Sequence, residues 1–171
     1  SGQLFLAETH KKALQALRQA DYLSPKYHVV IANPPYMGGK GMNGSLKTFL
    51  QENYSEYKSD LFSAFVVRCS DLGVKQSNIG VMSPNVWMYI SSHENLRTFL
   101  TESCALYSLV ELPLTGFKGA TVQICAYNFS NKHSPTLQGG YIRLVDFKGA
   151  DEEMSALTKA AIADSDCGWF Y

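Results

Sequence analysis

The spacing of apolar residues predicts alternating helices and strands along the first half of the chain. Residues 3–20 are good helix formers throughout, with Leu14 and Leu17 on one face, as in an amphipathic helix. The run from Tyr27 to Ala32 is short, nearly all apolar and rich in β-branched residues. This pattern predicts a strand that is buried on both faces of a parallel sheet.

A second helix and a second strand follow in the same order. Apolar residues recur at helical spacing over 60–72, and Gly73 is the expected stop. Residues 78–82 form the next predicted strand. Ser91 and Glu94 have the spacing of a capping box, which predicts the start of another helix.

Beyond this helix the pattern changes from alternating elements to consecutive strands. We predict strands at 106–112, 121–129 and 141–147, and a final helix at 151–163. The βαβα order at the start favours a parallel sheet with right-handed crossovers, and the end favours an antiparallel hairpin. A doubly wound fold needs more parallel strands than these. We therefore expect an α/β fold that is the C-terminal half of a truncated Rossmann-like sheet.

Composition narrows the class of protein. With 171 residues, 46% hydrophobic and 18% charged, the chain suits one globular domain and not a disordered segment. The formal net charge is zero, whereas a complete DNA-binding protein usually has a basic face. No apolar run is long enough to span a bilayer, and the start has neither a basic signal region nor an initiator Met.

The cysteines point to a cytoplasmic protein without a metal centre. The chain has four of them, none in a C-x-x-C pair and none with a histidine at ligand spacing. We therefore expect reduced, partly buried thiols and no metal site.

The segment Asn33-Pro34-Pro35-Tyr36 carries the chemistry. It directly follows the strand at 27–32, so it lies at the carboxyl end of the sheet, where open α/β folds bind ligands. Pro35 forces Pro34 into an extended backbone, and neither proline has an N–H to close a turn. The Pro34 carbonyl and the Asn33 side-chain oxygen then form two acceptors close together. The four residues could also be a simple turn, but their position after a strand favours a site.

Two such acceptors suit a primary amine that gives both protons to hydrogen bonds. The exocyclic amine of adenine fits, because out-of-plane hydrogen bonds free its lone pair for methyl transfer from a sulfonium. Adenine inside a duplex is out of reach, so the base must be flipped, at a cost of a few kcal/mol. Stacking on the Tyr36 ring returns about 1–3 kcal/mol.

The stretch from Tyr27 to Phe129 resembles the catalytic region of gamma-class adenine-N6 DNA methyltransferases. It is most similar to the large adenine methylases of phage-exclusion systems, the PglX type, and to fused type IIG restriction-modification enzymes. The resemblance implies that Asn33 and Phe65 contact S-adenosylmethionine and that Phe117 stacks with Tyr36 on the flipped base. The segments that carry it are 28–38, 58–65, 79–87 and 116–122.

The chain departs from this family's pattern in one respect. The Gly-rich loop that binds the cofactor, and the acidic residue that holds its ribose, do not occur before Asn33. We expect the cofactor loop upstream of residue 1, a partial catalytic domain at 1–147, and at 148–171 the start of a connection to a target-recognition region. The isolated chain should then bind S-adenosylmethionine poorly. It should also self-associate through the open edge of strand 27–32, or capture a strand from elsewhere in the same chain.

Several other residues have a plain and a functional interpretation. Residues 37–47 contain four glycines and predict a mobile loop, in which Lys40 and Lys47 are either solvated or contact DNA phosphates. Trp87 and Tyr89 line either the cofactor pocket or the core. His93 is expected to be a polar residue of a first helical turn, and Asp60 a helix cap rather than a catalytic acid.

Two rival functions remain. A protein-glutamine or RNA-guanine amino-methyltransferase uses the same kind of motif, but those enzymes are usually small and complete. The long segment between the tetrad and the next helix favours a large enzyme acting on duplex DNA. A non-catalytic, methylase-like module that binds DNA or a partner would not need an intact tetrad. The sequence leaves open whether the setting is restriction or phage exclusion.

Overall fold

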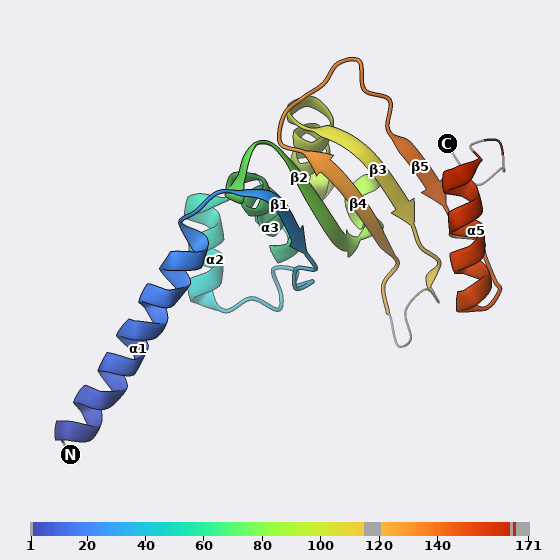
Figure 1. Cartoon of the computed structure of the whole chain (residues 1–171). Coiled ribbons are helices and arrows are strands. Elements are labelled where there is room, and N and C mark those ends of the chain that lie inside the picture. Colours follow the sequence, from blue (N-terminus) through green and yellow to red (C-terminus); the bar gives the residue numbers. More distant parts are fainter. Residues whose placement is uncertain (1, 115–120, 165, 167–171) are drawn as a thin grey trace.

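The computed structural model describes residues 2–114, 121–164 and 166. Five strands form one mixed sheet in the order β1-β2-β4-β3-β5 (Figure 1). β1 pairs with β2 in parallel, β4 runs antiparallel to both β2 and β3, and β5 is parallel to β3. The strands are β1 Tyr27–Ala32, β2 Gly73–Pro84, β3 Ala105–Glu111, β4 Ile124–Ser130 and β5 Gly140–Arg143.

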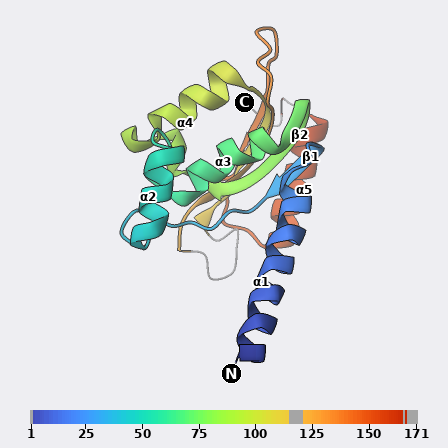
Figure 2. The ribbon, with the colours of Figure 1, turned by 90° about the vertical axis from the view of Figure 1, so that its left-hand side faces the viewer.

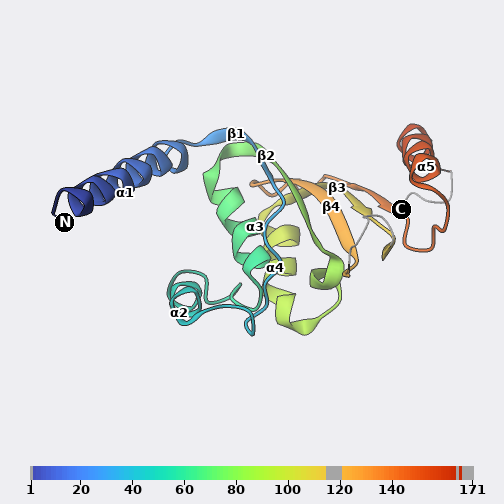
Figure 3. The same cartoon turned by 90° about the horizontal axis from the view of Figure 1, so that it is seen from below.

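The helices lie mainly on one side of this sheet. Figure 3 shows α2, α3 and α4 together below the strands, whereas α5 lies at the β5 end on the other side of the sheet. A continuous helical segment joins the short elements η2, α4 and η3, and η1 follows β2 directly. The helices are α1 Gly2–Leu23, α2 Gly44–Asn53, α3 Leu61–Leu72, η1 Asn85–Met88, η2 Ser91–His93, α4 Glu94–Thr98, η3 Phe99–Ser103 and α5 Asp151–Ala163.

The main core lies between the sheet and the helices α3 and α4. Phe62 and Val66 project from α3 and Leu96 from α4, and all three are almost fully buried. Ile79 and Phe129 meet them from β2 and β4. Burial of side chains of this size stabilises the fold by about 1.5–3 kcal/mol each.

The strand directions confirm the predicted mixed α/β sheet with an antiparallel hairpin. β1, β2, β3 and β5 all run the same way, so their carboxyl ends meet at one edge with the amino end of β4. We call this the carboxyl edge, and it is the lower edge of the sheet in Figure 1. The predicted helix at 151–163 is also confirmed.

The prediction that the first strand is buried on both faces is wrong. β1 is an edge strand, and helices cover only one of its faces, which leaves Ile31 82% exposed and Val29 57% exposed. No described segment pairs with the outer edge of β1. Among the described residues, the predicted capture of a strand from the same chain therefore does not occur. α1 projects away from the sheet (Figure 2), and its described side chains are exposed.

Two local predictions also need correction. Residues 37–47 are not one loop, because α2 begins at Gly44 and the Asn43 side chain caps it by accepting from the Leu46 N–H at 2.9 Å. The capping box at Ser91 and Glu94 does not form, since the segment starts as a 3-10 turn without a side-chain cap.

The C-terminal helix packs on the outer strand of the sheet. Met154 and Ala161 of α5 belong to a small cluster with Ile142 and Leu144 at the end of β5. The domain boundary after residue 147 stays a prediction. No helix among the described residues is long and apolar enough to cross a membrane.

The described cysteines agree with the expectation of reduced, buried thiols. Cys69, Cys104 and Cys125 are buried and not in disulfides. Burial raises the pKa of Cys104 and of Cys125 to about 12, so both remain thiols at neutral pH. The fourth cysteine, Cys167, lies outside the described residues.

Candidate active site

The candidate site is at the carboxyl edge, where several chain segments converge. Asn33 leaves the end of β1, Asn85 leaves the end of the neighbouring parallel strand β2, and Glu111 is the last residue of β3. β4 begins beside them at Ile124. Because parallel strands place their carboxyl ends together, residues far apart in sequence meet here.

The tetrad has the exposure that a ligand-binding segment needs. Asn33, Pro35 and Tyr36 are exposed and Pro34 is buried. The Tyr36 hydroxyl donates a hydrogen bond of 3.0 Å to Asn33 Oδ1, which fixes the amide oxygen as an acceptor. Among the described residues none donates a hydrogen bond to the Pro34 carbonyl. Burial, and then the neighbouring Cys125, raise the pKa of Tyr36, so its hydroxyl stays protonated.

Asp60 ties the exit of the tetrad to α3. Its Oδ1 accepts from the Met37 N–H at 3.0 Å and from the Phe62 N–H at 3.2 Å. The Leu61 N–H returns a bond to the Met37 carbonyl at 3.0 Å. Asp60 is therefore the helix cap that the sequence predicts, and it also clamps the chain one residue beyond Tyr36.

Phe65 lies one turn further along α3, and the residue is 39% exposed. It borders a depression of about 190 Å³ between α2 and α3. The exposed phenyl face and the apolar walls fit one face of a planar adenine ring. No carboxylate is present in the described lining, so the fit covers the adenine ring and not the ribose. The lining residues are Phe49, Leu50, Tyr54, Leu61, Ala64, Phe65 and Arg68.

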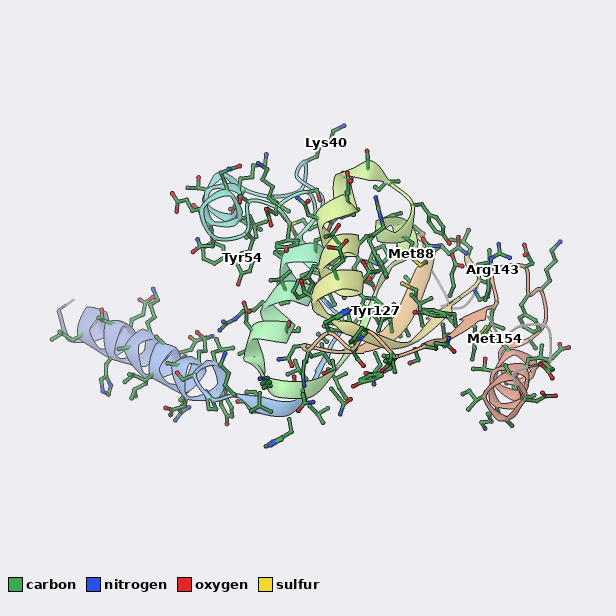
Figure 4. All side chains as sticks on the ribbon, turned by 90° about the horizontal axis from the view of Figure 1, so that it is seen from above. Lys40, Tyr54, Met88, Tyr127, Arg143 and Met154 are labelled. Atoms are coloured by element: carbon green, nitrogen blue, oxygen red, sulfur yellow. The ribbon has the colours of Figure 1, made fainter. Side chains whose placement is uncertain are left out.

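The two lysines near the tetrad are exposed. Figure 4 shows Lys40 at the tip of its loop with the side chain pointing outward. Lys47 is in the first turn of α2, and neither lysine has an ion-pair partner among the described residues. Their contact with phosphates stays a prediction.

Phe117 lies outside the described residues. The chain segments before and after it are fixed by backbone hydrogen bonds. The Leu112 N–H donates to the Ile124 carbonyl at 3.0 Å, and the Asn85 N–H donates to the Gln123 carbonyl at 3.0 Å. These bonds bring the stems of the connection between β3 and β4 to the carboxyl edge.

The sequence leaves open whether Trp87 and Tyr89 belong to the core or to a pocket. In the structure the two residues have different environments. Trp87 is 4% exposed and packs on Tyr127, with ring centroids 5.3 Å apart. Tyr89 is 64% exposed, and its hydroxyl donates to Glu111 Oε1 at 2.7 Å. Sequence reasoning missed Glu111 altogether, although a carboxylate inside the apolar run of β3 was a signal.

His93 lies in the 3-10 turn Ser91–His93 that precedes α4, and its side chain is buried. Its Nδ1 lies 3.0 Å from Ser63 Oγ and 3.3 Å from Ser59 Oγ, which flank Asp60 along the chain. Burial lowers the pKa of His93, so the ring is neutral at neutral pH. Among the described residues, no three His, Cys, Asp or Glu side chains gather closely enough to hold a metal ion.

Two relatives are adenine-specific methyltransferases by name. The chain is 34% identical over 148 residues to BrxX of Escherichia coli O9:H4 strain HS, with 85% of this chain and 12% of BrxX aligned. It is 30% identical over 147 residues to PglX of Lacticaseibacillus casei strain Zhang, with 84% of this chain and 12% of PglX aligned. The chain thus spans about one eighth of the length of these relatives.

Solved structures share the fold at low sequence identity. A class I S-adenosylmethionine-dependent methyltransferase structure from Listeria monocytogenes is 15% identical, with a TM-score of 0.60, over 81% of this chain and 42% of that one. The restriction-modification enzyme LlaGI, solved as a nuclease-deletion mutant with a DNA substrate mimic, is 16% identical with a TM-score of 0.60. It is matched over 83% of this chain and 17% of its own.

A family model matches residues 5–117, which include β1, the tetrad, the Asp60 clamp and the segment after β2. This match covers β1, β2 and β3, three of the strands that end at the carboxyl edge, and it agrees with the resemblance read from the tetrad. The chain belongs to the Eco57I restriction-modification methylase family.

Proposed function

We propose that this chain is the part of a longer adenine-N6 DNA methyltransferase that receives the target amine. The observation that supports it is the exposed Asn33 at the carboxyl end of β1, with its Oδ1 oriented by the Tyr36 hydroxyl at 3.0 Å. The relatives named adenine-specific methyltransferases favour adenine over glutamine or guanine as the substrate. The intact tetrad argues against a non-catalytic module.

The chain's own residues hold the amine in a reactive geometry. Asn33 Oδ1 has two lone pairs, one taken by the Tyr36 hydroxyl and one left for an amine N–H. The Pro34 carbonyl accepts the second N–H. Two acceptors out of the base plane draw the nitrogen toward tetrahedral geometry, and its lone pair then attacks a methyl carbon. The proton leaves after the N–C bond has formed, so no strong general base is needed.

S-adenosylmethionine would supply the methyl group as a sulfonium, with the S–CH₃ bond breaking as the N–CH₃ bond forms. On this chain Phe65 would hold one face of its adenine ring, and Asn33 would contact the cofactor from the end of β1. The remaining cofactor contacts would come from outside this chain.

DNA would enter with the target adenine flipped onto the Tyr36 ring, and Phe117 would support the base from the connection between β3 and β4. Lys40 and Lys47 are the first two cations after the tetrad along the chain and would contact phosphates. Since the chain has no net charge, most phosphate contacts would come from other parts of the full-length protein.

Methyl transfer to DNA by the full-length protein tests this proposal, measured with radiolabelled S-adenosylmethionine. Asn33→Ala should lower kcat about 100- to 1,000-fold, the usual loss for one preorganised polar group. Tyr36→Ala should weaken binding of the flipped base by about 1–3 kcal/mol. Tyr36→Phe keeps the ring and loses only the bond to Asn33, so it should retain much of the activity.

Thermal melting of each variant is the control for folding. Full methylation by a folded Asn33→Ala variant would refute the assigned role of the amide. Equal loss in Tyr36→Phe and Tyr36→Ala would show that the hydroxyl, and not ring stacking, is what Tyr36 contributes.

A further inference from the structure

A buried carboxylate at the carboxyl edge has no part in the methyl transfer described above. Glu111 is 5% exposed, and its Oε1 accepts from Asn85 Nδ2 at 2.8 Å and from the Tyr89 hydroxyl at 2.7 Å. Its Oε2 lies 3.7 Å from Nε of Arg143, which approaches from β5 (labelled in Figure 4). Burying a carboxylate is costly unless it is paired and hydrogen-bonded. In this cluster, the contacts with Asn85, Tyr89 and Arg143 supply the pairing, and they also fix the positions of these three side chains.

What the cluster holds is the segment from Asn85 to Ile90, immediately after β2. Asn85 is fixed through its side chain to Glu111 and through its N–H to the Gln123 carbonyl at 3.0 Å. Arg97 donates to the Trp87 carbonyl at 2.7 Å and to the Ile90 carbonyl at 2.6 Å. The segment is therefore held at both ends and in the middle.

Within this rigid segment Tyr89 has an inverted orientation. A tyrosine usually buries its ring and keeps its hydroxyl in water. Here the hydroxyl is bonded to buried Glu111, while the residue as a whole is 64% exposed. Burial, then the bond to Glu111, raise the pKa of Tyr89 to about 12, so the hydroxyl remains a donor at neutral pH. The exposed part of Tyr89 is thus its ring.

Tyr89 and Tyr36 stand at the same edge, at the exits of two neighbouring parallel strands. Cys125 of β4, which pairs with Ser83 of β2 and with Glu111 of β3, raises the pKa of both hydroxyls. A rigid, exposed aromatic ring at a ligand-binding edge is a stacking surface for a nucleobase, because every base has a flat face to offer.

We propose that Tyr89 is a further base-contacting residue of the site, beside Tyr36 and Phe117, and that Glu111 is the positioning residue that presents its ring. The occupant is a nucleobase of the bound DNA. This inference rests on the proposed function, since it needs DNA at the carboxyl edge.

The test uses the full-length protein and compares KM for DNA with KM for S-adenosylmethionine. Tyr89→Leu removes the ring and should raise KM for DNA about 5- to 150-fold, the equivalent of one stacked base. KM for the cofactor should stay within about twofold. Glu111→Gln keeps the shape of the side chain but removes its charge. Tyr89→Phe keeps the ring but removes the hydroxyl that bonds to Glu111. Both should raise KM for DNA by less than Tyr89→Leu does.

Tyr107→Leu is the matched control, because Tyr107 is an exposed tyrosine near the opposite end of β3. It should leave both constants unchanged. A wild-type protein that transfers no methyl group to DNA would refute the proposed function itself. A wild-type protein that is active, with Tyr89→Leu changing neither constant, would overturn this inference alone. So would a lower melting temperature with an unchanged KM for DNA, which would mean that the ring packs against another part of the protein.

Discussion

Asp60 offers the sharpest test of how the tetrad is held in place. Its Oδ1 accepts two backbone N–H groups, from Phe62 at the start of α3 and from Met37 just beyond the tetrad. Replacing Asp60 by Ala removes both bonds. Loss of a helix cap costs about 1 kcal/mol. The stranded Met37 N–H costs about 1 kcal/mol more, at the low end because Met37 is only half-buried and water reaches it.

The total of about 2 kcal/mol should lower the melting temperature of the chain by about 4–8 °C. Asn43→Ala is the matched control, since Asn43 caps α2 and accepts only from Leu46. It should cost about 1 kcal/mol, or half as much. Asp60→Asn keeps the acceptor oxygen and should lie close to wild type.

The effects of Asp60→Ala and Asn43→Ala should differ more in kcat than in melting temperature. In the full-length protein, Asp60→Ala frees the exit of the tetrad, and misplacement of the amine acceptors should lower kcat about 10- to 100-fold. Asn43→Ala should lower kcat much less, because the Asn43 side chain bonds to the Leu46 N–H within α2 and not to the segment after the tetrad. If the two substitutions had equal effects on melting and on kcat, Asp60 would be a cap and nothing more.

Three further predictions follow from burial and from the sheet edge. Phe62→Ala should cost about 3–5 kcal/mol in unfolding free energy, and Phe65→Ala far less, because only the first ring is buried; equal losses would contradict the placement of α3. Burial lowers the pKa of His93 below 6.5, so the stability it contributes is present above pH 6.5 and lost as the pH falls. The melting temperature of His93→Asn should therefore fall less on acidification than that of wild type, while exposed His10→Asn should behave as wild type. Light scattering of the isolated chain should show a mass that rises with concentration through the open edge at 27–32, and a constant monomer mass would count against this.

Local features of the fold were predictable from sequence because the rules that govern them act over a few residues. The helix at 151–163 and the helix from Leu61 to Leu72 are confirmed, and for the second of them Gly73 was the stop signal. The tetrad was found because a strand exit followed by two prolines restricts the backbone locally. The helix α2 was missed, since the glycines before it outweighed the cap at Asn43 in the prediction.

By itself the sequence determined the family, the tetrad and the order of the elements apart from α2. Only the tertiary structure decided which side chains meet at the carboxyl edge. The bond from Asn85 to Glu111 joins residues 26 apart, and the pairing of Ser63 with His93 joins residues 30 apart. Spacing along the chain does not encode such contacts, because strand order and register bring them together. The exposure of Ile31 was also decided by the tertiary structure. An apolar pattern shows that a segment suits a sheet, but it does not show whether another element covers that strand.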